Sequence, residues 1–197
     1  MAKRTAKVTR ETSETAVTVE WTVDGAGRSA ISTGIPFADH MLTSLARHGC
    51  FDLDVDADGD LEVDAHHTLE DIGLTLGQAL RQALGDRKGI RRFGAALVPM
   101  DEALAEVSID ICGRPFLAYD VKPVPAEAGG LNTRLFREFF QGLTTAAGLV
   151  VHITARAGDE PHHMLEAVFK AVARALDEAT QIDSRCTGVP STKGSLD

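Results

Sequence analysis

The sequence contains the pattern His-His-x-x-Glu twice, as His66-His67-Thr68-Leu69-Glu70 and as His162-His163-Met164-Leu165-Glu166. Imidazole nitrogens and carboxylate oxygens are ligands that several divalent transition metals accept. On a helix, adjacent side chains diverge by about 100°, whereas residues three or four positions apart share a face. The two histidines of each copy should therefore reach different ions, and the glutamate should join one of them. The two copies together offer enough ligands for two metal sites.

Two further residues are candidates for completing these sites. His40 lies on a helix predicted in the first half of the chain, and Glu138 lies on the corresponding helix of the second half. Isolated residues of this kind are often surface polar groups, and that alternative stays open for both. The repeated pattern could likewise be a solvent-exposed polar helix start if it occurred once. Its recurrence at the same place in both halves favours metal binding.

Basic residues stand beside glycines in three places, at residues 87–94, 113–115 and 190–194. Lys, Arg and Ser/Thr side chains in such segments suit a phosphate monoester, which takes charge-assisted and bidentate hydrogen bonds. For any single basic residue a solvated turn is the simpler interpretation. The segment Pro190-Ser191-Thr192-Lys193-Gly194 follows the last predicted helix, where packing gives no reason for it, and we expect it to be a functional arm.

Hydrophobic periodicity predicts the elements that position these residues. In the first half, alternating apolar residues predict strands and helical spacing predicts helices, with a turn at Asp58-Gly59 leading to Leu61 and Val63. The predicted strands cover 17–23, 29–33 and 51–55, and the predicted helices cover 37–48 and 66–84.

The second half repeats this order. The predicted strands cover 104–111, 115–121 and 149–155, the predicted helices cover 131–147 and 162–179, and 122–130 is predicted to be a loop. The sequence therefore predicts an α+β fold of two similar ββαβα-type repeats, each a mixed sheet with helices on one face, packed together. We expect one domain with a first half over 1–93, a second half over 94–183 and a C-terminal substrate-binding arm over 184–197.

Composition excludes several classes of protein. The 197 residues suit one domain, and 44% hydrophobic residues without a long apolar run argue against both disorder and a membrane span. A formal charge of −9 argues against nucleic acid as a partner. The three cysteines form no CxxC pair, and the N-terminal segment lacks the apolar stretch of a signal peptide. We therefore expect a cytoplasmic protein.

The ordered motifs resemble those of the imidazoleglycerol-phosphate dehydratase family over essentially the whole chain. The residues that carry the resemblance are Arg10-Glu11-Thr12 with Glu14-Thr15, Gly34–Phe37 with Asp39–Met41, His66–Asp71, Gly89–Gly94, Pro99–Leu104, Gly113–Pro115, His162–Ala171 and Pro190–Gly194.

The resemblance implies two Mn²⁺ ions per active site, at sites that neighbouring subunits complete. It implies that one ion takes His66, Glu70 and His162, and that the other takes His40, His67, His163 and Glu166. The family usually has a histidine where this chain has Glu138, so we expect a change of ligand type there rather than loss of the metal. It further implies a homo-oligomer of trimers assembled into a 24-subunit shell.

The resemblance also implies the reaction, which is dehydration of imidazole glycerol phosphate to imidazole acetol phosphate in histidine biosynthesis, with the two ions binding the substrate imidazolate. The phosphate-binding positions that match are Arg92, Arg114, Lys170, Ser191 and Lys193. Glu14 matches the residue beside the reacting carbons and is the expected base, with Glu166 as the second candidate, since metal ligation would lower its basicity. Two alternatives stay open: a dinuclear metal phosphoesterase, and a metal-storage or scaffold protein without catalysis.

Overall fold

The computed structural model describes residues 3–123, 125–194 and 196. The first half contains β1 (Thr5–Glu11), β2 (Thr15–Thr22), β3 (Ser29–Ser32), α1 (Pro36–Gly49), β4 (Asp52–Gly59) and α2 (His66–Leu84). The second half contains β5 (Phe93–Met100), β6 (Ala103–Asp110), β7 (Phe116–Asp120), β8 (Glu127–Ala128), β9 (Leu131–Asn132), a 3₁₀ turn (Thr133–Leu135), α3 (Phe136–Ala147), β10 (Val150–Ala157) and α4 (Pro161–Thr180).

The two halves form sheets with the same topology. Their strand orders are β1-β2-β4-β3 and β5-β6-β10-β7, and in each sheet only the last pair is parallel. The predicted α+β fold of two similar repeats is confirmed. Each four-stranded sheet has one strand more than predicted, namely β1 and β5, which both lie at a sheet edge. An edge strand tolerates outward polar residues such as Lys7 and a proline such as Pro99, and both obscure the periodic pattern.

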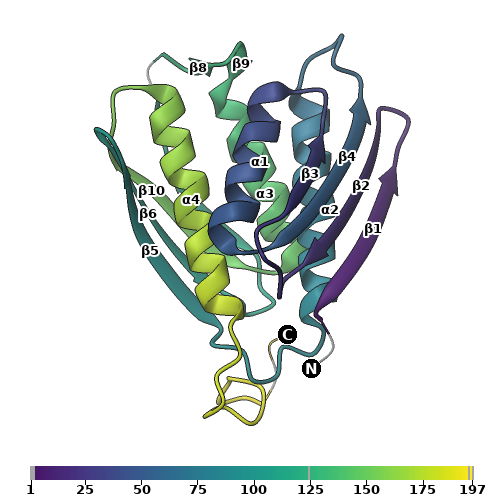
Figure 1. Cartoon of the computed structure of the whole chain (residues 1–197), viewed down its shortest axis with the longest axis vertical. Coiled ribbons are helices and arrows are strands. Elements are labelled where there is room, and N and C mark those ends of the chain that lie inside the picture. Colours follow the sequence, from purple (N-terminus) through teal and green to yellow (C-terminus); the bar gives the residue numbers. More distant parts are fainter. Residues whose placement is uncertain (1–2, 124, 195, 197) are drawn as a thin grey trace.

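The helices lie between the two sheets (Figure 1). Helix α2 packs on β1 and β2, helix α4 packs on β5 and β6, and the two helical layers meet where α1 contacts α4 and α2 contacts α3. Helices therefore cover one face of each sheet, as the apolar alternation of the strands requires. Close packing of α2 against α3 depends on Gly73, because a Cβ there would lie 2.2 Å from the carbonyl oxygen of Phe139.

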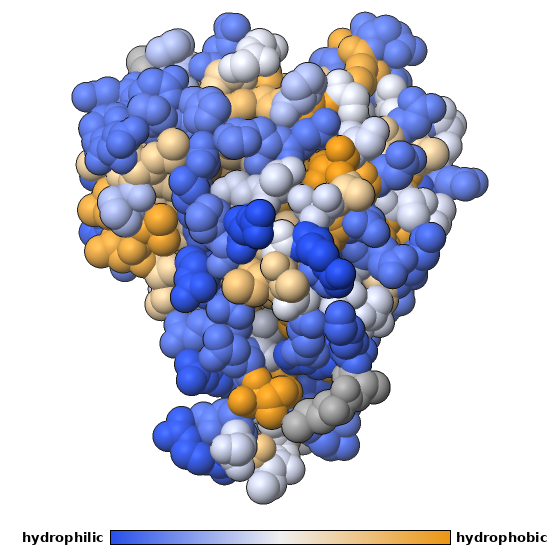
Figure 2. Space-filling model, viewed as in Figure 1, coloured by the Kyte–Doolittle hydropathy of each residue, from blue (hydrophilic) through white to orange (hydrophobic). Residues whose placement is uncertain are grey.

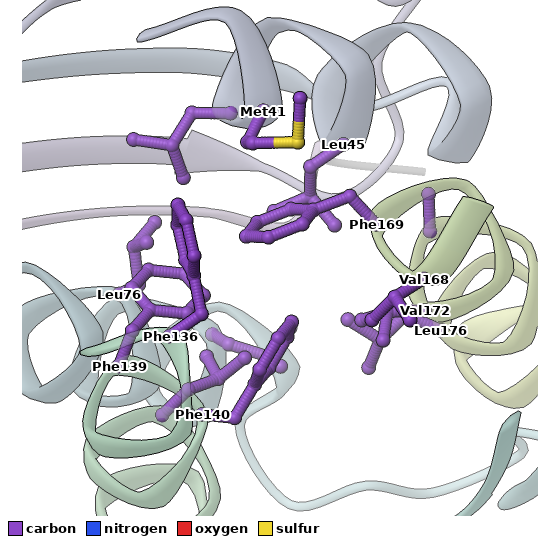
Figure 3. Close-up of a cluster of buried hydrophobic side chains, with 14 of the residues drawn as sticks. Met41, Leu45, Leu76, Phe136, Phe139, Phe140, Val168, Phe169, Val172 and Leu176 are labelled. Carbon is purple, nitrogen blue, oxygen red and sulfur yellow. The ribbon is translucent and has the colours of Figure 1, made fainter. Parts of the chain in front are cut away.

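The core between the helical layers is aromatic (Figure 3). Phe136, Phe139 and Phe140 of α3 surround Phe169 of α4, with ring centroids 5.1–5.6 Å from it. These side chains are almost completely buried, as is Met41 of α1. Burying a side chain of this size contributes about 1.5–3 kcal/mol. This core fixes the helices that carry the candidate ligands relative to one another.

Three local predictions need correction. The predicted helix over 131–147 begins at Phe136, because β9 and the 3₁₀ turn occupy its first residues, and the loop predicted over 122–130 includes the two-residue strand β8. The turn predicted at Asp58-Gly59 lies at residues 61–63 instead, because β4 continues to Gly59. This short turn connects β4 to α2, and Val63 in it is exposed and belongs to none of the described strands.

The C-terminal segment after α4 packs against residues 87–92. The backbone N–H of Gly89 donates to the carbonyl of Gly188, and Ile90 forms an isolated bridge with Ile182. The buried Arg87 donates to the carbonyl oxygen of Leu196. Among the described residues, no helix combines the length and the apolar composition that a membrane span requires.

Candidate metal centre and phosphate-binding residues

Helix α1 and helix α4 bring together three candidate ligands. His40 comes from the first turns of α1, which begins with Pro36 at a position that suits proline. His162 and Glu166 come from α4, whose first turn follows Pro161. The ligand atoms of His40, His162 and Glu166 all lie within 4.8 Å of one another.

Glu166 is the centre of this cluster. Its Oε2 lies 3.0 Å from Nε2 of His40 and 3.1 Å from Nε2 of His162, and its Oε1 accepts a hydrogen bond from Lys170 at 2.7 Å. Burial alone would raise the pKa of Glu166, but the hydrogen bonds from Lys170 and His40 outweigh it and lower the pKa to about 2. Glu166 is therefore an anion at neutral pH, as a metal ligand must be.

The start of α2 carries the other copy of the motif. Nε2 of His66 lies 3.9 Å from Oε2 of Glu70, so the first histidine and the glutamate form a pair, as in the second copy. The rings of His66 and His67 are inclined by 76° with centroids 5.8 Å apart, which is the divergence that helix geometry predicts. Nδ1 of His67 lies 2.9 Å from Oδ2 of Asp60 and 3.6 Å from Oε2 of Glu14.

A carboxylate also holds the second histidine of the other copy. Nδ1 of His163 lies 2.9 Å from Oε2 of Glu102, in the turn between β5 and β6. The hydrogen bonds that His67 donates to Asp60 and His163 donates to Glu102 raise the pKa of both histidines. A carboxylate on Nδ1 keeps a proton there and leaves the Nε2 lone pair for a metal.

Sequence reasoning missed both of these carboxylates. Glu102 lies within the segment Pro99–Leu104, which carried the family resemblance without a role for any residue, and Asp60 follows the Asp58-Gly59 turn. Their proximity to the histidines depends on how the strands pack against the helix starts. The acidic dipeptide Asp101-Glu102 just before the strand predicted over 104–111 was the only local signal available for Glu102.

The His40–His162–Glu166 cluster fits a divalent transition metal. It presents two imidazole nitrogens and one carboxylate oxygen at mutual distances that a single ion can bridge, and this mixed set suits Mn, Fe, Co or Zn. In the part of the chain that the structure describes, no ligand atom of His66 or Glu70 joins this cluster. Within one chain His162 therefore stands with His40 and Glu166, and not with the pair on α2.

Glu138 lies on α3, half-buried, with Oε1 3.2 Å from NH1 of the neighbouring Arg137. Two further histidines, His48 and His152, are exposed and lie outside the His40–His162–Glu166 cluster. The described residues of one chain thus present one cluster of three candidate ligands, and His66 and Glu70 form a separate pair.

The predicted phosphate-binding residues lie at the other end of the molecule, with one exception. Arg92 donates to both carboxylate oxygens of Asp110, at 2.7 and 3.1 Å, and to the carbonyl oxygen of Pro190 at 2.8 Å. It thereby fastens the C-terminal arm next to Ser191, whose Oγ accepts from the N–H of Lys193. Arg114 and Lys193 are exposed. The exception is Lys170, which lies halfway along α4 beside Glu166.

The length of α4 separates the two groups. The backbone N–H of Arg92 donates to the carbonyl of Ala179, in the last turn of α4, whereas His162 is in its first turn. The stretch from His162 to Ala179 is about 25 Å long at the helical rise per residue. Figure 1 shows α4 running from the end of the molecule near β8 and β9 to the end where the C-terminal segment lies. A small phosphorylated substrate cannot span this distance within one chain.

A hollow of about 850 Å³ lies between the last turns of α2 and α3 and the C-terminal segment. Its lining includes Gln78, Arg81 and Thr145, and none of the predicted site residues. The predicted chemistry therefore does not belong to this hollow.

Comparison with known proteins identifies the family. The family model for imidazoleglycerol-phosphate dehydratase matches residues 33–176. Dehydratases from Geobacter metallireducens and Gluconacetobacter diazotrophicus are 54% and 56% identical, and the alignments cover 98% of this chain and 99% and 98% of the relatives.

Solved structures agree. The fold is similar to crystal structures of the Staphylococcus aureus enzyme, with TM-score 0.82, 36% identity and coverage of 91% of this chain and 99% of that one. It is equally similar to the Pyrococcus furiosus enzyme in complex with (S)-C348, with TM-score 0.81, 38% identity and coverage of 96% and 100%. The chain therefore belongs to the imidazoleglycerol-phosphate dehydratase family.

Proposed function

We propose that this chain removes water from imidazole glycerol phosphate to give imidazole acetol phosphate, as a step of histidine biosynthesis. The observation that carries this proposal is the His40–His162–Glu166 cluster, in a chain that dehydratases match over nearly its full length. The phosphoesterase and storage alternatives have no comparable support.

Eight residues of the chain would hold two Mn²⁺ ions in this proposal, namely His40, His66, His67, Glu70, Glu138, His162, His163 and Glu166. The donor set supports it, because imidazole and carboxylate ligands suit this ion. When bound, such ions would act as Lewis acids that lower the pKa of the substrate's imidazole ring.

Glu14 is the proposed general base. The carbon that loses a proton bears a hydroxyl group and no neighbouring carbonyl, so a carboxylate must stand close to it. Glu14 lies in the turn between β1 and β2, half-exposed, and its carboxylate reaches within 3.6 Å of His67. Glu166 is the weaker candidate, because a pKa of about 2 leaves it little basicity.

The phosphate of the substrate would be bound by Lys170, Arg114, Ser191 and Lys193, with Arg92 holding the arm. Since about 25 Å of helix separates the arm from the His40 cluster, we propose that each complete site takes its ligands and its arm from different copies of the chain. The arm over 184–197 then serves a neighbouring subunit.

The outer face of the second sheet supports an assembly. Figure 2 shows a mostly hydrophilic face with several apolar patches, one of them at the side where β5 runs. Phe93, Leu97 and Phe116, all on that sheet, are 55–60% exposed. These side chains lie on the two edge strands β5 and β7, and exposed apolar side chains of this size favour burial by another copy. We propose the 24-subunit shell of trimers as the assembly, and its mass in solution tests it.

One assay tests the function. Formation of the ketone product from imidazole glycerol phosphate is followed with and without a chelator, together with release of inorganic phosphate. The proposal requires ketone formation that stops when the metal is removed, and no phosphate release. Phosphate release without ketone would favour the phosphoesterase, and metal binding without turnover would favour the storage protein.

A further inference from the structure

A buried carboxylate lies directly behind the α2 copy of the motif. Asp71 follows Glu70, lies one helical turn after His67, and is only 7% exposed. Its Oδ1 accepts a hydrogen bond from Nε of Arg10 at 2.8 Å, and its Oδ2 accepts one from Oγ1 of Thr15 at 2.5 Å. Both partners come from the hairpin of β1 and β2.

Arg10 and Thr15 stand on either side of the turn that carries Glu14. Within this turn, Oγ1 of Thr12 accepts hydrogen bonds from the backbone N–H groups of Glu14 and Thr15, at 3.1 and 3.0 Å. These hydrogen bonds stabilise the turn, and Asp71 fastens both of its strands to α2. Glu14 is about half exposed, so its own side-chain contacts do little to hold it in place.

The second half of the chain lacks these three polar residues as a set. The strand register gives the equivalent residues. Arg10 pairs with Val17 in the first sheet, and Val98 pairs with Ala105 at the same place in the second sheet. Thr15 and Ala103 are the first residues of β2 and β6. Ala167 follows the motif glutamate Glu166 as Asp71 follows Glu70. The equivalents of Arg10, Thr15 and Asp71 are thus Val98, Ala103 and Ala167.

The second half therefore builds the same sheet and helix with apolar residues at these positions, and Ala103 and Ala167 are fully buried. Asp71 and Thr15 are buried and Arg10 is partly exposed. Replacing buried charged groups by well-packed apolar residues is often neutral or stabilising, so folding alone does not explain the polar set in the first half. The feature that distinguishes the first half is Glu14. Among the described residues, no backbone N–H donates a hydrogen bond to the Glu14 side chain, whereas Glu102 in the equivalent turn accepts one from Glu160.

We infer that Arg10, Thr15 and Asp71 are positioning residues that hold the β1–β2 turn against α2, so that the Glu14 carboxylate stays beside His67. This inference rests on the proposed function, in which Glu14 takes a proton from the substrate. A displacement of about 1 Å at a reacting group can cost a hundredfold in rate, so the fastening acts on turnover rather than on substrate binding.

The second half supplies the test substitution. The triple variant Arg10→Val/Thr15→Ala/Asp71→Ala installs the residues found at the equivalent positions. We expect an unchanged circular dichroism spectrum, an unchanged number of Mn²⁺ ions per chain, a kcat lowered about a hundredfold and a KM changed less than about threefold. In a Glu14→Gln background the same triple substitution should cause no further loss.

The outcomes separate this inference from the proposed function. The positioning role is wrong if Glu14→Gln is inactive but the triple variant keeps its kcat. It is also wrong if the loss of kcat in Glu14→Gln and the loss in the triple variant multiply when the substitutions are combined. If Glu14→Gln is itself active, the proposed base is wrong and the inference falls with it.

A second pair of variants decides the case if the triple variant does not fold. Thr15→Val removes the hydroxyl that donates to Asp71 without changing the side-chain shape, and should lower kcat about tenfold with KM nearly unchanged. Thr15→Ser restores the donor and should bring kcat back to within about threefold of the original value. Equal kcat values for the two variants would overturn the inference.

Discussion

Glu102 and Glu14 occupy corresponding turns of the two halves, and each directs a carboxylate oxygen towards Nδ1 of the second histidine of its motif. The Glu102 oxygen lies 2.9 Å from Nδ1 of His163, whereas the Glu14 oxygen lies 3.6 Å from Nδ1 of His67. In the first half Asp60 makes the close contact instead, at 2.9 Å. In the first half, Asp60 from another segment therefore accepts the hydrogen bond of His67. The Glu14 carboxylate remains available to act as a base.

Glu102 should control metal affinity. Its Oε2 orients His163, and its Oε1 accepts from the N–H of Glu160, the residue that caps α4. Groups that orient a ligating histidine typically change metal affinity 10–100-fold when removed. Glu102→Ala should weaken Mn²⁺ binding by about that factor in a chelator competition titration.

Two variants control this experiment. Glu102→Gln keeps an oxygen that can accept from Nδ1 and should lose less affinity than Glu102→Ala. Glu20→Ala removes an exposed carboxylate from the outer face of β2 and should bind Mn²⁺ normally. Equal affinities for Glu102→Ala and Glu20→Ala would show that Glu102 does not orient a ligand.

Glu14→Gln should abolish most turnover without loss of metal. A positioned general base typically contributes a factor of about 10²–10⁴, and the amide cannot accept the proton. Elemental analysis should return the same number of Mn²⁺ ions per chain as for the unchanged protein. A near-normal kcat would remove Glu14 from the mechanism.

We predict that Glu138 acts as a metal ligand, at a position where the family resemblance implies a histidine. Glu138→Ala should weaken binding of one ion and lower the metal content after dialysis, whereas Glu138→His should restore it because imidazole suits the same ions. Arg137→Ala is the control, since Arg137 contacts Glu138 at 3.2 Å and is not a candidate ligand. Unchanged metal content in Glu138→Ala would show that this carboxylate does not ligate.

The ion pair between Arg4 and Asp24 should make stability depend on pH in the acid range. Arg4 donates to both oxygens of Asp24 and to the carbonyl oxygen of Thr180, so it ties the start of the chain to the end of α4. The side-chain hydrogen bond from Arg4 lowers the pKa of Asp24 below its ordinary value of 3.8. A lowered folded-state pKa stabilises the protein above pH 3.8, and this contribution is lost as pH falls through the lowered pKa.

Asp24→Asn should therefore be less stable than the unchanged protein at pH 6, by up to about 1 kcal/mol since the pair is partly exposed to solvent. Urea denaturation should show the difference shrinking as pH falls below 3.8. Lys122→Met, which breaks the fully exposed pair with Asp120, should change little at any pH. A difference that grows on acidification would contradict the assignment.

Sequence periodicity predicted the helices better than the contacts among their side chains. Helix α2 has the predicted bounds, 66–84, because apolar residues keep helical spacing until Gly85. Strand β1 escaped prediction because only Val8 in it is buried. The roles of Asp60 and Glu102 could not be predicted, because their contacts with the histidines join segments whose approach depends on tertiary packing. The repeat was visible in the sequence. Which residues of the two halves are equivalent, and where they differ, became clear only from the strand register.

Sharing of sites between copies should be visible as complementation. His162→Ala lacks a cluster ligand, and Arg114→Ala/Lys193→Ala lacks groups of the phosphate-binding arm; each variant alone should be inactive. The two variants are co-expressed in equal amounts. If a site takes its cluster from one chain and its arm from another, both parts are intact in about a quarter of the sites. About a quarter of the normal activity should then return. Co-expression of His162→Ala with Glu166→Ala should restore no activity, because both substitutions remove a ligand of the same cluster. A site built within one chain would give no recovery with either combination, and the separation of about 25 Å along α4 would then have to be closed by a movement of the arm.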